Sequence, residues 1–512
     1  MLVKTYCSAV FGINATSITV EVNVTAGLKY FIVGLPDNAV KESIQRIESA
    51  ILSIGYYMPR QKIVVNLAPA DIRKEGSSYD LAIALGILAA SNQLSSDELQ
   101  KYIILGELSL DGKVHPVKGV LPIAIQAKLD GFSGLILPIV NAEEAAIVSG
   151  IDVYGVQDLK EAAEFLINIK KIETTTINIE ERFEQLLSNY DLDFPDVKGQ
   201  ENIKRALEIA AAGGHNVILI GPPGSGKTML AKRLPTILPP LTIDESLETT
   251  KIHSVSGQLP CSTSLLTIRP FRAPHHTISD IALVGGGTNP QPGEISLAHN
   301  GVLFLDELPE FKRSVLEVMR QPLESRNINI SRAKFSVDYP ASFMLIAAMN
   351  PCPCGFYNHP FRPCICGSNH VQKYISKISG PLLDRIDIHI EVTPVEFNEL
   401  TNKNSGETSE VIRNRVITAR KIQEQRFRKF PNIHSNAQMR AKNIQEICII
   451  EEGGKKLLKM AIERLNLSAR AYDRILKVAR TIADLESSIE ITNEHLAEAI
   501  QFRSLDRENW TG

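Results

Sequence analysis

One glycine-rich segment constrains the fold of this chain more than any other feature. An apolar run at 216–220 precedes the segment and a helical pattern follows it from residue 229, so the setting is strand, loop and helix. This arrangement predicts an α/β domain built on a parallel sheet. The segment matches the pattern G-x-x-x-x-G-K-[ST] in full, with the residues Gly221, Pro222, Pro223, Gly224, Ser225, Gly226, Lys227 and Thr228.

The residue types of this segment suit the phosphates of a nucleotide. Glycines let backbone N–H groups surround phosphate oxygens without a Cβ clash, and the helix N-terminus adds partial positive charge. Lys227 would place its ammonium on the β- and γ-phosphates, and the Thr228 hydroxyl can bind Mg²⁺. The alternative is a glycine-rich turn that binds nothing, which the strand–loop–helix setting disfavours. We therefore expect ATP and Mg²⁺ as cofactors.

Two further apolar runs end in polar side chains that suit the same chemistry. The run 302–305 leads into Asp306, a candidate Mg²⁺ ligand, and Glu307, a candidate base for the attacking water. The run 343–348 leads to Asn350, whose amide can lie between these acids and the γ-phosphate. Alone, the acids could be solvated and Asn350 could be a turn residue, because a proline follows it. Beside a phosphate loop, the set predicts ATP hydrolysis.

The chain divides into three patterned regions. Residues 1–170 alternate between strand and helix patterns, with period-two alternation at 17–24, a helical pattern at 38–54 and a hairpin signal at 111–112. Residues 171–195 are polar and suit a linker. Residues 196–395 form a second α/β unit, and 396–512 are charged and helical in pattern. At 512 residues, about three domains are expected.

Composition limits the surroundings of the chain. The net charge is −3, so any nucleic-acid contact must come from a local patch rather than from bulk charge. The longest clean apolar stretch, at 81–90, is too short for the roughly 20 residues that a bilayer requires. The first residues lack the apolar core of a signal peptide. We expect a cytoplasmic protein without a membrane anchor.

Four of the seven cysteines crowd into one short segment. Four thiolates satisfy tetrahedral Zn²⁺, and the intervening loop is long enough to fold back, although the C-x-C spacing is tighter than usual. Either His359 or His370 could replace one thiolate. Free buried thiols are the alternative. In a reducing compartment, the clustering favours a structural zinc site in the loop 352–366, made by Cys352, Cys354, Cys364 and Cys366.

The nucleotide-site residues are those of an AAA+ ATPase, and segment 285–307 resembles the magnesium-chelatase branch of that superfamily. Segment 380–387 is similar to the arginine-finger segment of the branch, which implies that Arg385 reaches the γ-phosphate in a neighbouring subunit. Segment 468–470 resembles sensor 2, which makes Arg470 a second catalytic phosphate contact. Without the resemblance, each arginine would be read as part of a surface salt bridge.

The resemblance extends over the whole chain. It implies a Lon-protease-like α+β N-terminal domain of the ribosomal S5 domain 2 type, a P-loop AAA+ core and a helical C-terminal lid. Together these are similar to the ComM/YifB group of competence-associated, magnesium-chelatase-like proteins. Membership implies a homo-oligomer, a hexameric ring that uses ATP to move DNA, with branch migration during natural transformation as its activity.

The N-terminal region resembles the Lon protease domain but lacks its lysine. Ser78 falls at the position of the nucleophile, and 106–119 is similar to the hairpin segment of that domain. A Ser–Lys dyad needs a lysine base, yet Leu121 stands at the matching position, with Lys118 three residues earlier. We expect a non-proteolytic relative that assembles the ring or contacts nucleic acid.

Two basic segments are candidates for DNA contact. Residues 327–338 are predicted to form a β-hairpin, and the family resemblance directs it into the pore, where Arg332 and Lys334 would contact phosphates without reading sequence. A solvated turn is the alternative. Residues 413–429 predict a basic amphipathic helix that contacts DNA or a neighbouring subunit, or that is simply solvated. The adjacent pair His275 and His276 is interpreted as structural.

Three functions remain open from the sequence. The first is a ring-forming AAA+ motor that moves DNA. The second is a motor that remodels a protein partner, like the ATPase subunit of magnesium chelatase. The third is a Lon relative that is non-enzymatic or proteolytic, which the complete nucleotide motif and Leu121 respectively disfavour.

Overall fold

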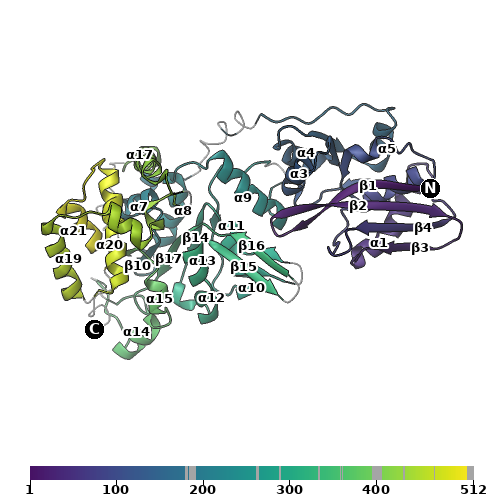
Figure 1. The fold of residues 1–512 in the computed structure, drawn as a ribbon. Coiled ribbons are helices and arrows are strands. Elements are labelled where there is room, and N and C mark those ends of the chain that lie inside the picture. The colour runs from purple at the N-terminus through teal and green to yellow at the C-terminus, as the bar shows by residue number, and fades with distance from the viewer. Residues whose placement is uncertain are drawn as a thin grey trace.

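The chain folds into an elongated molecule with the N-terminal domain at one end and the C-terminal helices at the other (Figure 1). The core that contains the glycine-rich segment lies between them. In this computed structural model the described residues are 1–178, 183, 192–260, 264–287, 290–332, 335–357, 359, 361–394, 406–430, 433–465 and 467–503. The side chains of 332 and 335 are outside the description.

A seven-stranded mixed sheet forms the N-terminal domain, in the order β3-β4-β2-β1-β5-β8-β9. Its strands are β1 (Leu2–Phe11), β2 (Asn14–Thr25), β3 (Tyr30–Val33), β4 (Lys62–Ala68), β5 (Tyr102–Ile104), β8 (Gly134–Pro138) and β9 (Asp152–Val156). The alternation at 17–24 correctly predicted β2. Strand β1 was not predicted, because polar residues interrupt its apolar side. It nevertheless occupies the middle of the sheet, pairing with both β2 and β5.

Helices cover this sheet. All residues of α2 are buried, because it packs on β1 and β2 and is itself covered by α1. The side chain of Asp37 caps α1 by accepting from the backbone N of Val40 at 2.8 Å. The predicted hairpin around 111–112 is present but short, as β6 (Glu107–Leu108) and β7 (Val114–His115). The helices are α1 (Asn38–Ser53), α2 (Asp80–Ala90), α3 (Val120–Leu129), α4 (Ile139–Ala146) and α5 (Leu159–Leu166).

The core contains a second sheet, with five parallel strands in the order β11-β14-β17-β10-β18. Strand β17 lies between β10 and β14, so three strands with functional residues at their ends are neighbours. Since the strands are parallel, their carboxyl ends meet at one edge of the sheet. The strands are β10 (Val217–Ile220), β11 (Phe271–Arg272), β14 (Val302–Leu305), β17 (Met344–Met349) and β18 (Ile388–Glu391).

Short helices and two hairpins surround this sheet. The predicted hairpin at 327–338 is present as β15 (Asn327–Arg332) and β16 (Phe335–Pro340), paired antiparallel. Strands β12 (Gly285–Gly286) and β13 (Gln291–Pro292) form the second. The helices are α7 (Glu201–Gly213), α8 (Lys227–Ile237), α9 (Ile243–Ser256), α10 (Asp280–Val284), α11 (Glu294–Leu297), α12 (Arg313–Val318), α13 (Arg320–Ser325), α14 (Ser368–Ile375) and α15 (Gly380–Leu383).

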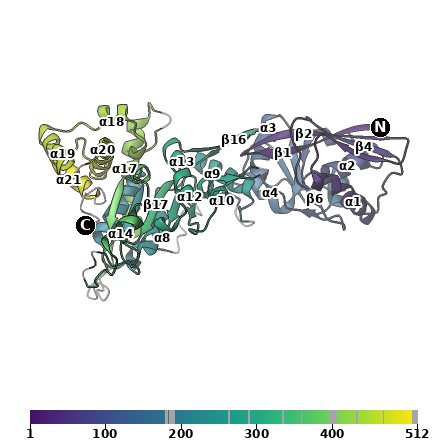
Figure 2. The same ribbon diagram turned by 90° about the horizontal axis from the view of Figure 1, so that it is seen from below.

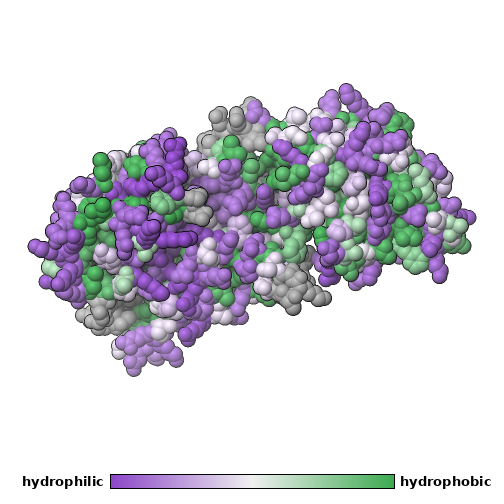
Figure 3. Space-filling model, in the orientation of Figure 1, coloured by the Kyte–Doolittle hydropathy of each residue, from purple (hydrophilic) through white to green (hydrophobic). Residues whose placement is uncertain are grey.

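The C-terminal helices pack against the core rather than standing apart. Helix α20 contacts α7, and its buried residues share one apolar core with strands β10 and β18. Helix α17 also lies on α7 and α8. In Figure 3 these helices carry mostly hydrophilic residues on the visible face. The elements are α17 (Ser409–Phe427), α18 (Ala441–Ile447), α19 (Glu452–Leu465), α20 (Ala469–Leu485) and α21 (Asn493–Gln501).

Among the described residues, the N-terminal domain contacts the core through helix α3 and through the β1–β2 turn, and both views show the two domains meeting (Figures 1 and 2). Helix α3 packs on α9, where Leu121, Ile147 and Leu265 form a small apolar cluster. At the second place the β1–β2 turn approaches hairpin β15–β16. Ile13 packs on the apolar side of that hairpin, and a Cβ at Gly12 would lie 2.6 Å from Val337.

Across the described ranges, none of the helices is both long and apolar enough to cross a membrane.

Candidate nucleotide site and cysteine cluster

The carboxyl ends of β10, β14 and β17 bring together the residues that the sequence predicted for one site. Lys227 begins helix α8, directly after the loop that follows β10. Its ammonium donates to the carbonyl oxygens of Gly221 at 2.7 Å and Pro222 at 2.8 Å. It also lies 3.3 Å from the side-chain oxygen of Asn350, which follows β17.

Burial lowers the pKa of Lys227, and the charge of Asp306 partly opposes that effect. The contacts of this ammonium are two carbonyls and an amide oxygen, which are neutral acceptors. A polyphosphate beside it would supply the missing negative charge and favour the protonated amine. The site is therefore electrostatically suited to an anionic ligand.

Oxygen donors suited to Mg²⁺ lie next to this lysine. The Thr228 hydroxyl donates to Oδ2 of Asp306 at 2.7 Å, and the other carboxylate oxygen accepts from the backbone N of Glu307 at 2.9 Å. A hydroxyl and a carboxylate are hard oxygen ligands, which Mg²⁺ prefers, usually beside substrate phosphates. These two side chains fit that ion.

The loop itself leaves space for a ligand. Gly224 has φ +76°, and a Cβ built on it would meet no atom within 4 Å. The side-chain oxygen of Ser225 is buried and finds no partner within the described ranges, while the backbone carbonyl of Ser225 accepts from Gln200 at 3.0 Å. A cavity of about 610 Å³ opens above the loop, within the usual range of ligand sites. Residues 222–226 line it.

Glu307 adopts a strained backbone and pairs with a residue that the sequence interpretation did not include in this site. Its φ of 53° places it in the left-handed region, which non-glycine residues uncommonly occupy. Its carboxylate lies 3.3 Å from Nδ1 of His276. The only sequence signal was the adjacent pair of histidines, which we interpreted as structural.

The two predicted phosphate-contacting arginines pair with carboxylates of their own chain. Arg385 is 8% exposed and donates to the carboxylate of Glu324 and the carbonyl of Pro381. Its Nε is buried and has no hydrogen-bond partner among the residues that the structure describes. Arg470, at the start of α20, lies 3.1 Å from the carboxylate of Asp384. Both arginines therefore come from the region where α15 meets the C-terminal helices.

A buried polar cluster ties strand β10 to helix α20. The carboxylate of Asp387 lies 3.0 Å from Nδ1 of His215 and accepts from Arg474 at 2.8 Å. The other ring nitrogen of His215 lies 2.8 Å from the hydroxyl of Thr481. Burial raises the pKa of Asp387, but Arg474 and His215 lower it more. The pKa of this carboxyl therefore lies well below its usual range. Helix α20 is thus fixed to the residue that leads into strand β10, the strand before the phosphate loop.

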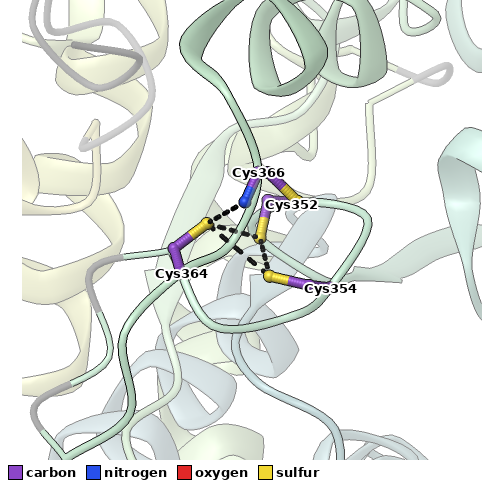
Figure 4. Close-up of side chains that lie close together, drawn as sticks. All are labelled: Cys352, Cys354, Cys364 and Cys366. Atoms are coloured by element: carbon purple, nitrogen blue, oxygen red, sulfur yellow. Dashed lines mark hydrogen bonds between the residues drawn. The ribbon is translucent and has the colours of Figure 1, made fainter.

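The four clustered cysteines come together in one loop (Figure 4). The sulfur of Cys352 lies 3.3 Å from that of Cys354 and 3.6 Å from that of Cys364. All four sulfurs, including that of Cys366, lie within 4.8 Å of one another. Tetrahedral Zn²⁺ with bonds of about 2.3 Å places its sulfurs about 3.8 Å apart. The donor set and its spacing therefore fit zinc.

The structure describes the two basic segments to different extents. Lys334 lies outside the described residues, and of Arg332 only the backbone is described, at the end of β15. In α17, several cations bind their own chain instead of solvent. Arg415 pairs with Glu208, and Arg426 pairs with Asp484. The reason is that α17 packs on α7, so its basic face is partly internal.

In the N-terminal domain, Ser78 and Leu121 occupy the two positions that resemble the Ser–Lys dyad of Lon, and they differ in burial. Ser78 is partly exposed. Leu121 is fully buried in the cluster shared with Leu265 of the core. The side chain of Lys118 lies over Gly257, at the end of α9, so it too contacts the core. The region that would hold a lysine base in the protease serves as a contact between domains here.

Three family models match consecutive parts of the chain. The model for magnesium chelatase, subunit ChlI, matches 193–400. The model for subunit ChlI of Mg-chelatase matches 20–141, and the model for the ChlI C-terminal part matches 406–503. The matched ranges thus include the core sheet, the C-terminal helices, and strands β3, β4, β5 and β8 of the N-terminal sheet.

Similar proteins span the full length. Competence protein ComM of Haemophilus influenzae is 45% identical over 504 residues, covering 98% of this chain and 97% of that protein. YifB of Escherichia coli is 43% identical over 502 residues, covering 98% and 96%. Lon protease 2 of Bacillus subtilis is 29% identical over 189 residues, covering 31% and 33%. The chain therefore belongs to the ComM/YifB family of magnesium-chelatase-like proteins.

Proposed function

We propose that this protein is an AAA+ ATPase that forms a hexameric ring and moves DNA, promoting branch migration during natural transformation. The observation that carries the ATPase part is the meeting of Lys227, Thr228, Asp306 and Asn350 at one edge of the parallel sheet. The name of the Haemophilus relative, a competence protein, supports a role in natural transformation.

Each residue of the site has one role in this proposal. Bound ATP supplies the phosphoanhydride bond whose cleavage releases free energy. Lys227 holds the β- and γ-phosphates, while Thr228 and Asp306 hold Mg²⁺. Glu307 takes a proton from water as a general base, and Asn350 orients the reacting groups through its amide.

Two arginines complete the proposal across subunits. Arg385 would leave Glu324 and stabilise negative charge in the neighbouring subunit's site, a role that suits a planar, permanently charged guanidinium. Arg470, which lies on helix α20, would leave Asp384 and bind a phosphate of the nucleotide instead. A monomer is then nearly inactive, because each site needs a residue of its neighbour.

DNA contact belongs to hairpin β15–β16 in this proposal. Arg332 ends strand β15, and Lys334 follows it in the sequence outside the described residues; both would contact backbone phosphates inside the ring, independently of sequence. The zinc site proposed at Cys352, Cys354, Cys364 and Cys366 has a structural role, since four thiolates leave no open position for a reacting water.

A second candidate function is a motor that remodels a protein partner, as in metal chelation. The observation in its favour is the match of the core to the magnesium-chelatase ChlI model at 193–400. ATPase activity that DNA does not stimulate would favour this candidate. A proteolytic role is tested separately by casein cleavage with ATP present, where Leu121 predicts no activity.

The deciding experiment is ATP-dependent resolution of a labelled four-way DNA junction. The matched control is Lys227→Ala, which removes the ammonium from the phosphate loop. Resolution by the natural protein alone supports a DNA motor. ATPase activity without resolution, and unaffected by DNA, contradicts the proposal and shifts it to the protein-remodelling candidate.

A further inference from the structure

The cysteine loop lies against the phosphate loop. Strand β17 ends at Met349, and Cys352 follows Asn350 by two residues, so the candidate zinc ligands begin directly beside the predicted catalytic amide. Gly355 has φ +82°, and a Cβ on it would lie 2.5 Å from Cδ of Pro223. Such contact requires glycine, because any side chain would collide with the phosphate loop.

Beyond Gly355, the same loop enters the cavity of the nucleotide site. Four of its side chains line the cavity of about 610 Å³ together with residues of the phosphate loop and of 196–200. They are Phe356, His359, Phe361 and Arg362. Phe361 is 75% exposed, so its ring is accessible to a ligand in this cavity.

These side chains form an ordered group rather than a loose loop. Nδ1 of His359 accepts from the backbone N of Phe361 at 3.0 Å and of Arg362 at 3.1 Å. The guanidinium of Arg362 lies 5.3 Å from the ring centre of Phe356, a cation–π distance. The group presents an aromatic ring and a cation to the cavity, which are the partners that a purine base and a phosphate take.

No helix or strand holds this group among the described residues between β17 and α14. The four cysteines bracket it, with Cys352 and Cys354 before it and Cys364 and Cys366 after it. Four free thiols contribute little to ordering, whereas a metal bound by four thiolates fixes both ends of the loop at once. Metal binding and the shape of the cavity wall are thereby coupled.

We propose that the zinc-bound cysteine loop is part of the nucleotide-binding site, with Phe361 and Arg362 contacting the nucleotide directly. The inference rests on the proposed ATPase function, since it concerns the same cavity. It adds a metal-dependent wall to the site, so loss of zinc weakens nucleotide binding even though no zinc ligand touches the nucleotide.

The test measures zinc content and the affinity for a fluorescent ATP analogue on the same full-length samples. The natural protein is expected to hold one zinc per chain. Phe361→Ala keeps the zinc but weakens analogue binding roughly five- to hundred-fold, the usual worth of one stacked base. The double variant Cys364→Ser, Cys366→Ser loses zinc and shows at least the same weakening. Ile365→Ala is the control, because Ile365 is 87% exposed between two of the cysteines.

Three results would overturn the inference. One is natural protein without zinc. Another is unchanged analogue affinity in Phe361→Ala, which would remove the direct contact. The third is a zinc-free variant that binds the analogue normally but has lost DNA affinity, which would make the loop a DNA-binding element. If the natural protein binds the analogue no better than Lys227→Ala does, the proposed ATPase function itself fails.

Discussion

Nδ1 of His276 lies 3.3 Å from the Glu307 carboxylate, in a pair that joins the segment before α10 to the end of β14. A base that already has a partner is oriented, because its carboxylate cannot rotate freely. We expect Glu307→Gln to lower ATP turnover by about 10²- to 10⁴-fold with nucleotide affinity retained. His276→Ala is expected to lower kcat by about tenfold at unchanged KM.

The control for that pair is the neighbouring histidine. His275 stacks on His276 with ring centres 4.1 Å apart, yet the pair with Glu307 belongs to His276. Steady-state kinetics of His275→Ala should therefore match the natural protein. Equal losses in both histidine variants would show that the segment acts only through its fold.

Arg385 is expected to act on the neighbouring subunit. Arg385→Ala should abolish ATP hydrolysis while leaving nucleotide affinity unchanged, and Lys227→Ala should abolish binding. Mixing the two inactive variants should restore part of the activity, because an intact site then receives Arg385 from its neighbour. Activity measured across mixing ratios checks this, and a mixture that stays inactive contradicts action between subunits.

Removal of the Asp387 carboxylate should destabilise the junction of core and C-terminal helices. Asp387→Ala leaves the buried His215 and the half-buried Arg474 without their shared partner, a loss of about 3–5 kcal/mol in unfolding free energy. Asp384→Asn is the matched control, because its partner Arg470 is well exposed and such pairs contribute only about 0–1 kcal/mol. Urea unfolding followed by far-UV circular dichroism compares the two.

Stability should fall as the pH drops below about 6.5, the usual pKa of histidine. Burial lowers the pKa of His389 well below that value, Arg503 lowers it further, and Asp387 opposes this. Below pH 6.5 the unfolded chain binds a proton that the folded chain does not, so stability decreases by up to about 1.4 kcal/mol per pH unit.

The pH effect is checked with thermal unfolding at pH 7.5 and 5.5. His389→Gln should reduce the difference between the two midpoints. His434 is exposed, so His434→Gln should leave the difference unchanged. The same slope in all three proteins would assign the pH dependence to other groups.

Leu121 should be needed for docking of the N-terminal domain. Leu121→Asp places a carboxylate in the apolar cluster with Ile147 and Leu265, which is costly without a partner. Limited proteolysis should then cut faster within 171–195. Leu129→Asp on the same helix is the control, because Leu129 is 75% exposed. Equal cleavage of both variants would contradict a docking role.

The meeting of Lys227, Thr228, Asp306 and Asn350 was predictable because its signals are local. The segment 221–228 carries its motif within eight residues, and Asp306 and Asn350 each follow a recognisable apolar run. The cysteine cluster was predictable for the same reason. These segments meet at one edge of the core sheet, because the carboxyl ends of parallel strands lie at the same edge.

The missed features depend on residues that are distant in sequence. His276 meets Glu307 across 31 positions, from 276 to 307, and Arg385 meets Glu324 across 61. No periodicity connects such pairs. The arginines of α17 were hard to place for another reason. A run of basic residues predicts an exposed helix face, yet Arg415 and Arg426 bind acids of the helices that pack on α17.

The contact between Gly12 and Val337 has a mechanical consequence. Strands β1 and β2 pair along ten positions, so they form a stiff ribbon about 33 Å long. The tip of that ribbon lies on hairpin β15–β16, while its body is the middle of the N-terminal sheet. A displacement of the hairpin therefore acts on the tip of a ribbon that continues into the middle of the N-terminal sheet.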